Sequence, residues 1–258
     1  MGLQNENGHA VRSEASAQAL YAQAKRCFNN GSGVADYRHG FKLLKKAAEL
    51  GNIAAHVWLG AAYDYGLGTR PNRRAAFEHY KIAANTGDPS AEYHVGVFYH
   101  DGIAIKRDYA AAVSWLRRAA KHGEYNAVHL LGQCYRYGRG VSRNSRKGFD
   151  LERQAAKKRI IEAQFSVGVC YSRGEGVDAS APDAFKWYLL AAKRGHADAA
   201  HNVALCYERG SGVEKNLRKA ERWYKRATEL AHSAQPQGEG RRSGGSPRLT
   251  HRARRSAL

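Results

Sequence analysis

The fold follows from a pattern that is complete in residues 163–195, which read AQFSVGVCYSRGEGVDASAPDAFKWYLLAAKRG. Its Ala163, Gly168 and Tyr171 lie at offsets of 0, 5 and 8 residues, so they fall on one face of a helix with about 3.6 residues per turn. The Gly-x-Gly stretch at 174–176 comes next, and glycine readily adopts the positive φ that ends a helix. We therefore expect an amphipathic helix that stops at a glycine turn.

The same pattern returns every 36 residues, in repeats that begin at residues 19, 55, 91, 127, 163 and 199. One position of each repeat holds a residue type that favours the N-cap of a helix. The six residues at this position are Asp36, Asn72, Asp108, Asn144, Ser180 and Asn216. A cap at one register predicts that a second amphipathic helix, of about four turns, follows in every repeat.

Each repeat therefore has a helix, a glycine turn and a capped second helix. A single repeat cannot bury its apolar face alone, whereas stacked repeats share one continuous core. The sequence predicts an all-α fold, an α/α solenoid of six 36-residue helix-turn-helix repeats over residues 19–232. Before it we expect a disordered polar leader, 1–18. After it we expect a disordered basic tail, 233–258, whose composition cannot bury apolar area.

The composition excludes several classes of protein. Hydrophobic residues make up 43% of the 258 residues, which is enough for a sizeable core. No apolar run reaches the ~18 residues of a membrane span, and residues 1–16 lack the apolar segment of a secretory signal. The 42 Lys and Arg against 23 Asp and Glu give a net charge of +19, which favours anionic partners or surfaces.

At the repeated positions the sequence resembles the Sel-one-like repeat (SLR) family, a relative of the tetratricopeptide repeat. The third repeat carries the pattern as Ala91, Gly96, Tyr99, Gly102, Asp108, Tyr109, Ala112, Trp115, Ala119, Ala120 and Gly123. The fifth carries it as Ala163, Gly168, Tyr171, Gly174, Gly176, Val177, Ala184, Trp187, Tyr188, Ala191, Ala192 and Gly195. The resemblance implies a right-handed superhelix that binds other proteins on its concave side, as an adaptor in multiprotein assemblies.

Three of the four cysteines, Cys134, Cys170 and Cys206, occupy the same position in successive repeats. Neighbouring repeats stack about 10 Å apart, whereas a disulfide needs Cα atoms within ~7 Å, so we expect that these thiols do not bridge. They then act as small buried residues of a protein in a reducing compartment. We expect the cytoplasm, with the nucleus as an alternative.

Sequence motifs for catalysis and metal binding are absent. The twelve histidines form no H-E-x-x-H, and no C-x-x-C, nucleophile motif or phosphate-binding loop occurs. His94, His129 and His201 lie at similar positions of three repeats; we expect polar groups on a groove wall, with a shared ligand set as the alternative. The sequence thus predicts no catalytic residue, no cofactor and no metal, and so no enzyme.

The relation to the tetratricopeptide repeat implies that the first helix of each repeat lines the concave groove. The exposed positions then follow the tyrosine of each helix or lie upstream of it. The candidate partner-binding residues are Asp64, Tyr65, Tyr93, His100, Asp101, His129, Arg136, Tyr137, Phe165, Arg173, His201 and Arg209. The acidic residues come early and the arginines late, which favours a protein or peptide partner that is acidic near the C-terminal repeats. Alternatively, these are ordinary solvated side chains.

A second hypothesis rests on where the charge lies. The fourth repeat has nine Lys and Arg against three Asp and Glu, and the tail has six Arg against one Glu. Such clusters bind nucleic acid or an anionic surface through charge, so a polyanion binder is the alternative function. No base-reading motif or row of stacking aromatics supports sequence-specific recognition. A tail that only keeps the protein soluble is the other alternative.

Overall fold

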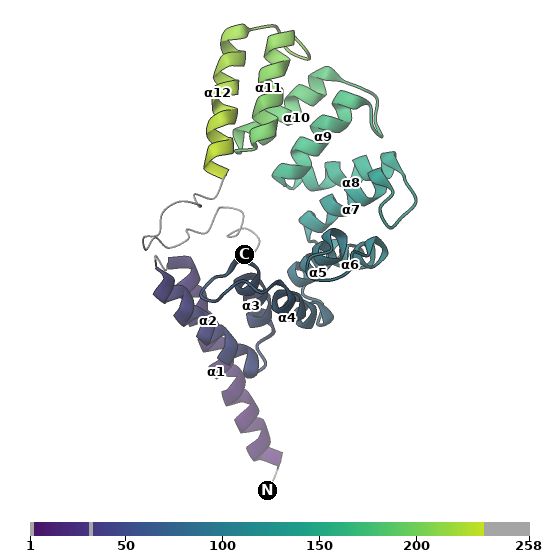
Figure 1. Cartoon of the computed structure of the whole chain (residues 1–258). Helices are drawn as coiled ribbons and strands as arrows, with labels where there is room; N and C mark the ends of the chain where they lie inside the picture. The colour runs from purple at the N-terminus through teal and green to yellow at the C-terminus, as the bar shows by residue number, and fades with distance from the viewer. Residues whose placement is uncertain (1–2, 31–32, 235–258) are drawn as a thin grey trace. The chain divides into compact units, whose positions relative to one another are not determined.

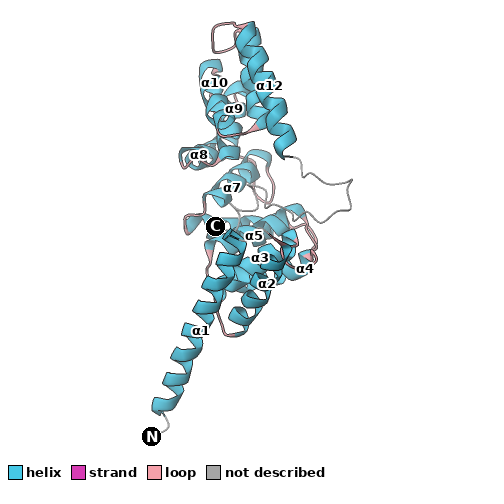
Figure 2. Cartoon of the chain, turned by 90° about the vertical axis from the view of Figure 1, so that its left-hand side faces the viewer, coloured by secondary structure: helices cyan, strands magenta, loops and turns pink. Residues whose placement is uncertain are grey.

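The computed structural model describes residues 3–30 and 33–234 of the chain. These residues form twelve α-helices and no strand (Figure 1, Figure 2). The helices are α1 (Leu3–Asn30), α2 (Val34–Glu49), α3 (Ile53–Tyr65), α4 (Arg73–Asn85), α5 (Pro89–Asp101), α6 (Tyr109–Lys121), α7 (Tyr125–Tyr137), α8 (Ser145–Lys157), α9 (Ile161–Arg173), α10 (Ala181–Lys193), α11 (Ala197–Arg209) and α12 (Leu217–Ala234). The predicted all-α class, with two helices in each repeat, is confirmed.

The chain divides into two compact units, with the boundary between Arg107 and Asp108. The first unit holds α1 to α5 and the second holds α6 to α12. The boundary separates the two helices of the third repeat. Within each unit, helices that follow one another in sequence pack together. We call α3, α5, α7, α9 and α11 the first helices of their repeats, and α2, α4, α6, α8, α10 and α12 the second helices.

Five of the six predicted N-caps are confirmed. Backbone N–H groups three residues further on donate to their side chains at 2.9–3.3 Å, and these five residues are Asn72, Asp108, Asn144, Ser180 and Asn216. The prediction for Asp36 is wrong, because α2 begins at Val34 and takes Gly33 as its N-cap. Asp36 lies in the first turn instead, where its carboxylate faces the positive end of the helix dipole.

The first helices have caps that the sequence pattern did not predict. Side chains at the residue before α3, α5, α7 and α11 accept hydrogen bonds from the first turn, and these residues are Asn52, Asp88, Glu124 and His196. The equivalent residue before α9 is Ile160, which makes no side-chain cap. All five first helices end at a glycine in the left-handed conformation, with φ of 69–72°, which confirms the predicted glycine turn.

The two helices of a repeat approach closely where a glycine faces a ring. A Cβ added to Gly60 would lie 2.7 Å from the ring of Tyr80, and one added to Gly168 would lie 2.6 Å from the ring of Tyr188. Both tyrosines are buried, and burial of a large side chain contributes roughly 2–3 kcal/mol. The glycine of the repeat thus makes room for an aromatic ring of the core.

The N-terminal end of the structure differs from the prediction. The sequence predicts a disordered leader over 1–18, whereas Leu3–Asn30 is one helix, α1. Ala24 and Phe28 on this helix are buried in the core of the first compact unit. Burial of these side chains anchors the second half of α1, because a helix in a protein gains most of its stability from packing against its neighbours.

The C-terminal end is described as far as Ala234. Ser233 and Ala234 are the last residues of α12, so the predicted tail overlaps the helix by two residues. The rest of the predicted tail, 235–258, lies outside the described residues. Within the described ranges, no helix combines the length and the apolar character that crossing a membrane requires.

Candidate functional site

In the first compact unit, most of the predicted groove residues reach the surface. Tyr65 and Asp101 are exposed, and Tyr93 is half-buried. Asp64 is more covered, with 18% of its side chain accessible, and its Oδ1 lies 3.7 Å from Nε of Arg73. Burial raises the pKa of Asp64, and the Arg73 guanidinium opposes that shift. Asp64 is therefore a paired carboxylate at the edge of the surface.

His100 is buried, so its predicted exposure is wrong. Only 7% of the residue is accessible. Its Nδ1–H donates to the carboxylate of Asp101 at 2.6 Å, which satisfies the ring nitrogen away from water. His100 is therefore a buried residue that orients the exposed carboxylate of Asp101.

In the second compact unit, six of the seven predicted residues reach the surface at least in part. The exposed ones are Tyr137, Arg173, His201 and Arg209, and the half-buried ones are His129 and Phe165. The seventh, Arg136, is only 4% exposed, so its predicted exposure is wrong.

Arg136 is buried because Glu152 lies opposite it on α8. Nη2 of Arg136 is 3.4 Å from Oε1 of Glu152, a residue with no accessible surface. Nη1 donates to Sγ of Cys170 at 3.0 Å and lies 3.6 Å from Oε2 of Glu175. The guanidinium is therefore surrounded by two carboxylates and a thiol, and its charge is compensated inside the protein.

Two glycines bring α7 and α8 together at this point. A Cβ on Gly132 would lie 2.8 Å from Cγ of Glu152, and one on Gly148 would lie 2.7 Å from the carbonyl oxygen of Gly132. The two backbones are thus in contact, which encloses the side chains beside them. The position of Glu152 is apolar or aromatic in the other repeats, where it holds Leu44, Tyr80, Leu116, Tyr188 and Tyr224. A charge in this position was the sequence signal for the buried pair.

Burial sets the protonation of this cluster. It raises the pKa of Glu152 to about 7, against the opposing effect of Arg136. Burial, followed by the Glu152 carboxylate, raises the pKa of the Cys170 thiol to about 12, and burial raises that of Cys134 to about 11. Both thiols stay protonated at neutral pH, unlike reactive cysteines. The predicted burial is confirmed for these two, while Cys206 is partly buried.

A cavity of about 420 Å³ opens beside the cluster, on the side of the first helices. Five of the predicted groove residues line it, namely His129, Arg136, Tyr137, Phe165 and Arg173. Five further residues that the sequence pattern missed complete its walls, namely Gln133, Glu162, Ser166, Val169 and His196. The cavity is therefore formed by α7, α9 and the N-cap of α11.

The cavity combines aromatic and polar walls. The ring of Phe165 stacks on His196 with 4.4 Å between centroids. His196 is fixed in turn, because its Nδ1 accepts a hydrogen bond from the N–H of Ala199 at 3.2 Å. Burial, with a further effect of Arg136, lowers the pKa of His129 to about 4, so this imidazole is neutral at physiological pH. Such a site suits one apolar or aromatic side chain with polar contacts around it.

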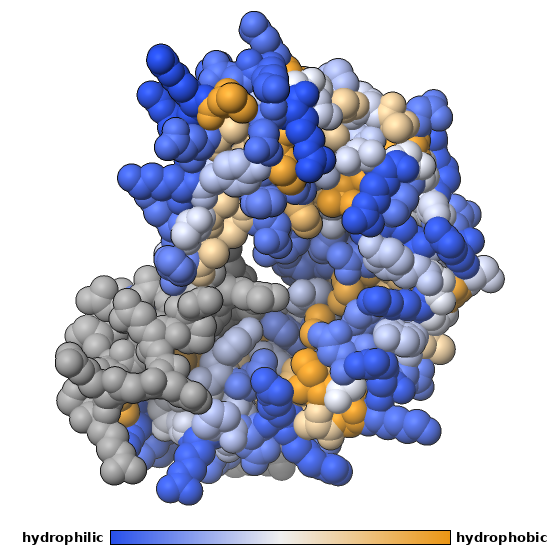
Figure 3. Space-filling view, turned by 45° about the horizontal axis from the view of Figure 1, so that its top comes forward, coloured by the Kyte–Doolittle hydropathy of each residue, from blue (hydrophilic) through white to orange (hydrophobic). Residues whose placement is uncertain are grey.

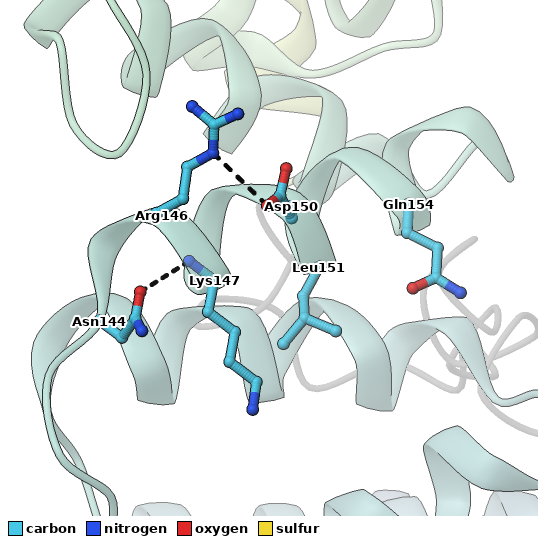
Figure 4. Close-up of a pocket in the computed structure, with 6 residues that line it drawn as sticks. All are labelled: Asn144, Arg146, Lys147, Asp150, Leu151 and Gln154. Carbon is cyan, nitrogen blue, oxygen red and sulfur yellow. Dashed lines mark hydrogen bonds and ion pairs between the residues drawn. The ribbon is translucent and has the colours of Figure 1, made fainter.

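A second hollow, of about 360 Å³, lies on α8, the second helix of the fourth repeat (Figure 4). Its walls come from α8 and its N-cap, namely Asn144, Arg146, Lys147, Asp150, Leu151 and Gln154. Figure 4 shows the ion pair between Arg146 and Asp150, which are 3.6 Å apart. Two basic residues, Arg146 and Lys147, and one acidic residue, Asp150, line this hollow, and it shares no residue with the first cavity.

The three histidines singled out in the sequence have different surroundings. His94 is buried and stacks on Tyr80 with 4.3 Å between centroids. His129 lines the cavity, and His201 is exposed beside Tyr224, with 5.3 Å between centroids. Within residues 3–30 and 33–234, no group of three or more His, Cys, Asp and Glu side chains is arranged to hold a metal ion.

Paired helices with capped starts, glycine ends and one repeated core contact define a helical-repeat solenoid protein. A family model described as "Sel1 repeat" matches residues 15–52, 53–88, 89–124, 126–159, 161–196 and 197–232. The chain therefore belongs to the Sel1 repeat family. Proteins of this family generally mediate protein–protein interaction, and their scaffold is generally non-catalytic.

Solved structures show the same fold. A Sel1 repeat protein from Oxalobacter formigenes is 28% identical, with a TM-score of 0.76 over 83% of this chain and 87% of that one. A protective antigen of uropathogenic Escherichia coli with an SLR fold is also 28% identical, with a TM-score of 0.74 over 90% of this chain. This chain spans 50% of the length of that antigen. An immunity protein from Pseudomonas aeruginosa, 21% identical with a TM-score of 0.58 over 84% of this chain and 82% of that one, shares the fold. No curated protein sequence matches the chain.

Proposed function

We propose that this protein is a non-catalytic adaptor that binds a protein segment on the face formed by its first helices. The observation that carries the proposal is the cavity of about 420 Å³, in which five residues predicted for the groove meet from two consecutive first helices. An extended or helical segment laid across such helices places its side chains into openings of this kind. The general role of Sel1 repeat proteins in protein–protein interaction supports this assignment.

The walls of the cavity define what the segment presents. An apolar or aromatic side chain enters between Tyr137, which is 48% exposed, and Phe165. A carboxylate beside it meets Arg173, whose side chain is 65% exposed and whose Nη1 lies 3.6 Å from Oε1 of Glu175. A guanidinium has five donors, so this ion pair leaves Arg173 able to bind a second carboxylate.

The acidic character of the partner rests on these local contacts. The helices α7, α9 and α11 have net charges of +1, 0 and −1, which cancel. The first-helix face of the second compact unit is therefore neutral as a whole. Arg173 and Arg209 are its exposed cations, and they select carboxylates one at a time.

The test is a peptide-display selection on the full chain. We expect enriched peptides that pair an apolar residue with a nearby Asp or Glu. Their affinity should fall at least tenfold in the double variant Arg173→Glu/Arg209→Glu, because two cations become anions. The matched control is Lys186→Glu/Arg222→Glu, which changes the net charge equally on second helices. A selection without enrichment, or equal affinities for both variants, would overturn the proposal.

We also propose a reducing compartment, the cytoplasm or the nucleus. The four cysteines of the described residues are Cys27, Cys134, Cys170 and Cys206, and all four are free thiols. Alkylation of the unfolded protein, taken from its own cells under thiol-blocking conditions, should add four labels. Fewer labels that rise to four after reduction would contradict this placement.

A further inference from the structure

Positive charge in the second compact unit lies on its second helices. Lys and Arg exceed Asp and Glu by three on α6, two on α8, one on α10 and three on α12, which makes nine together. The first helices α7, α9 and α11 of the same unit sum to zero. The helices that form the cavity are therefore neutral, and the helices that alternate with them are strongly basic.

The excess is concentrated on one exposed stripe of each second helix. Positions i, i+4, i+7 and i+11 of a helix lie on one side, and on α6, α8, α10 and α12 these positions are all exposed or half-buried. Ten of these sixteen residues are basic, namely Arg117, Lys121, Arg146, Arg153, Lys157, Lys186, Lys193, Arg218, Arg222 and Lys225. Two are acidic, Asp150 and Glu229. We call the ten basic residues the basic stripe.

The repeat keeps the four helices in register. The Gly-x-Gly turns place Gly140, Gly176 and Gly212 against the carbonyl groups of Tyr109, Ser145 and Ala181, at the start of the preceding second helix. A side chain at any of these glycines would overlap that carbonyl. Each second helix therefore starts beside the one before it, and equivalent residues such as Lys121, Lys157 and Lys193 recur at the spacing of stacked helices, about 10 Å.

Few charges of the basic stripe are compensated within the protein. Asp150 lies 3.6 Å from Arg146 and 3.3 Å from Arg153. Within the described residues, neither Lys186 nor Arg222 forms an ion pair. A surface with this charge density attracts polyanions over a distance of about 10 Å at ordinary ionic strength.

We propose that the basic stripe is a second interaction surface, which binds the phosphate backbone of a nucleic acid without reading its sequence. The regular spacing of cations along successive helices suits a linear chain of phosphates. A bilayer would need an apolar face beside the cations, whereas the large exposed hydrophobic residues of α6 to α12 are the scattered Tyr137, Leu190 and Leu217. Figure 3 likewise shows a surface on which hydrophilic residues separate small apolar areas.

The two surfaces then have different partners. The first helices hold a protein segment, and the second helices hold a polyanion, so that one chain brings both together. This inference does not depend on the proposed function, because no basic residue of the stripe lines the cavity.

The test measures binding of a fluorescein-labelled 30-nucleotide single-stranded RNA to the full chain by anisotropy. In Lys186→Glu/Arg222→Glu, two phosphate contacts are lost, and each is worth a factor of roughly 5 to 8 at about 0.1 M salt, so affinity should fall on the order of 30-fold. The slope of log K against log salt should flatten by about 1.4 to 1.8. The control Arg173→Glu/Arg209→Glu has the same net charge and should lose less than threefold.

Helix content and the thermal midpoint of each variant are measured first. If the charge-reversed variant is less stable than the wild type, Lys186→Gln/Arg222→Gln replaces it. Its affinity for the RNA should then fall by about half as much on a logarithmic scale, or roughly 5-fold. Equal losses in the stripe variant and its control would overturn the proposal, and so would a wild-type chain that does not bind the RNA at low salt. Phosphatidylserine vesicles form the contrasting arm: loss of vesicle binding in the stripe variant with RNA binding unchanged would also overturn it.

Discussion

Nη2 of Arg136 and Oε1 of Glu152 lie 3.4 Å apart in a core where the other repeats place a leucine or a tyrosine at the position of the carboxylate. This pair reaches the groove through two contacts. The Arg136 guanidinium lies 4.7 Å from the ring centroid of Tyr137 and 3.6 Å from Glu175, which in turn lies 3.6 Å from Arg173. A buried ion pair thus orients two of the side chains that we assign to partner binding.

The buried pair should contribute little net stability, although each half depends on the other. At pH 8, Arg136→Met should cost about 3 kcal/mol, because it leaves the buried Glu152 carboxylate without its main counter-charge. The double variant Arg136→Met/Glu152→Leu should return to within about 1 kcal/mol of the wild type, since apolar side chains of similar size fill the space. Urea unfolding followed by circular dichroism measures both. A double variant as unstable as the sum of the single ones would refute the coupling.

Glu152 should make the protein more stable at mildly acidic pH. Its pKa is raised from 4.5 in the unfolded chain to about 7 by burial, so the folded state binds a proton that the unfolded state releases. The contribution is fully present below pH 4.5 and is lost as the pH rises through 7, which amounts to roughly 3 kcal/mol at about 1.36 kcal/mol per pKa unit. Glu152→Gln cannot ionise and should flatten this dependence.

The comparison uses the difference in unfolding free energy between wild type and Glu152→Gln at pH 5 and pH 8. The buried histidines change the unfolding free energy in the opposite direction over part of this pH range. Their contribution is the same in both proteins, so it cancels in the difference. An identical difference at the two pH values would show that Glu152 does not titrate as the structure implies.

A pair of histidines in the first compact unit should make it sensitive to acid. Nδ1 of His56 and Nδ1 of His79 are 3.0 Å apart, and burial, followed by His56 and Lys45, lowers the pKa of His79 from 6.5 to about 4. The stability from neutral His79 is present above pH 6.5 and is lost as the pH falls through 4, by up to about 3 kcal/mol. His79→Leu, which copies Leu43 and Leu151 of other repeats, should remove this loss.

The measurement for His79 is the urea midpoint at pH 7.5 and pH 4.5, in the wild type and in His79→Leu. We expect the midpoint of the wild type to drop more on acidification. A variant that drops as far as the wild type would mean that protonation of this pair does not limit stability.

Asn72 and Asp36 occupy the same position of their repeats, but only Asn72 caps its helix with its side chain. Asn72 caps α4 through a 3.0 Å hydrogen bond from the N–H of Ala75, so Asn72→Ala should cost about 1 kcal/mol. Asp36→Ala should cost less, about 0.5 kcal/mol, because Asp36 lies inside the first turn, where its charge favours the positive end of the helix dipole and its side chain does not cap the helix. Urea unfolding compares the two, and equal costs would mean that Asp36 also caps its helix.

The sequence predicted the helices well because their boundaries depend on local chemistry. An N-cap residue and a glycine turn act within four residues of a helix end, and both recur at a fixed spacing. The failure at Asp36 has a local cause too, since Gly33 starts α2 three residues earlier. Residues 3–18 were predicted as a disordered leader because their composition is polar, whereas the structure has them in one helix with residues 19–30, whose Ala24 and Phe28 are buried.

The site was predictable only in part, because exposure depends on the neighbouring helix. The residue after the tyrosine is exposed at Ser172 and Glu208, yet His100 and Arg136 at the same position are buried. Arg136 is buried because it pairs with Glu152 on the second helix, and the repeat spacing alone does not predict that contact. His196, another cavity residue, was missed because the sequence pattern did not predict caps for the first helices, although Asn52 and Asp88 occupy the same position and cap theirs.

The measurement that tests the central claim most directly is photo-crosslinking of a display-selected peptide to the full chain. A photoreactive phenylalanine replaces Tyr137 in one protein and Lys186 in another, since the first side chain lines the cavity and the second lies on the basic stripe. We predict a covalent adduct from position 137 that excess unlabelled peptide abolishes, and none from position 186. An adduct from position 186 alone, or equal adducts from both positions, would contradict the binding of a protein segment by the first helices.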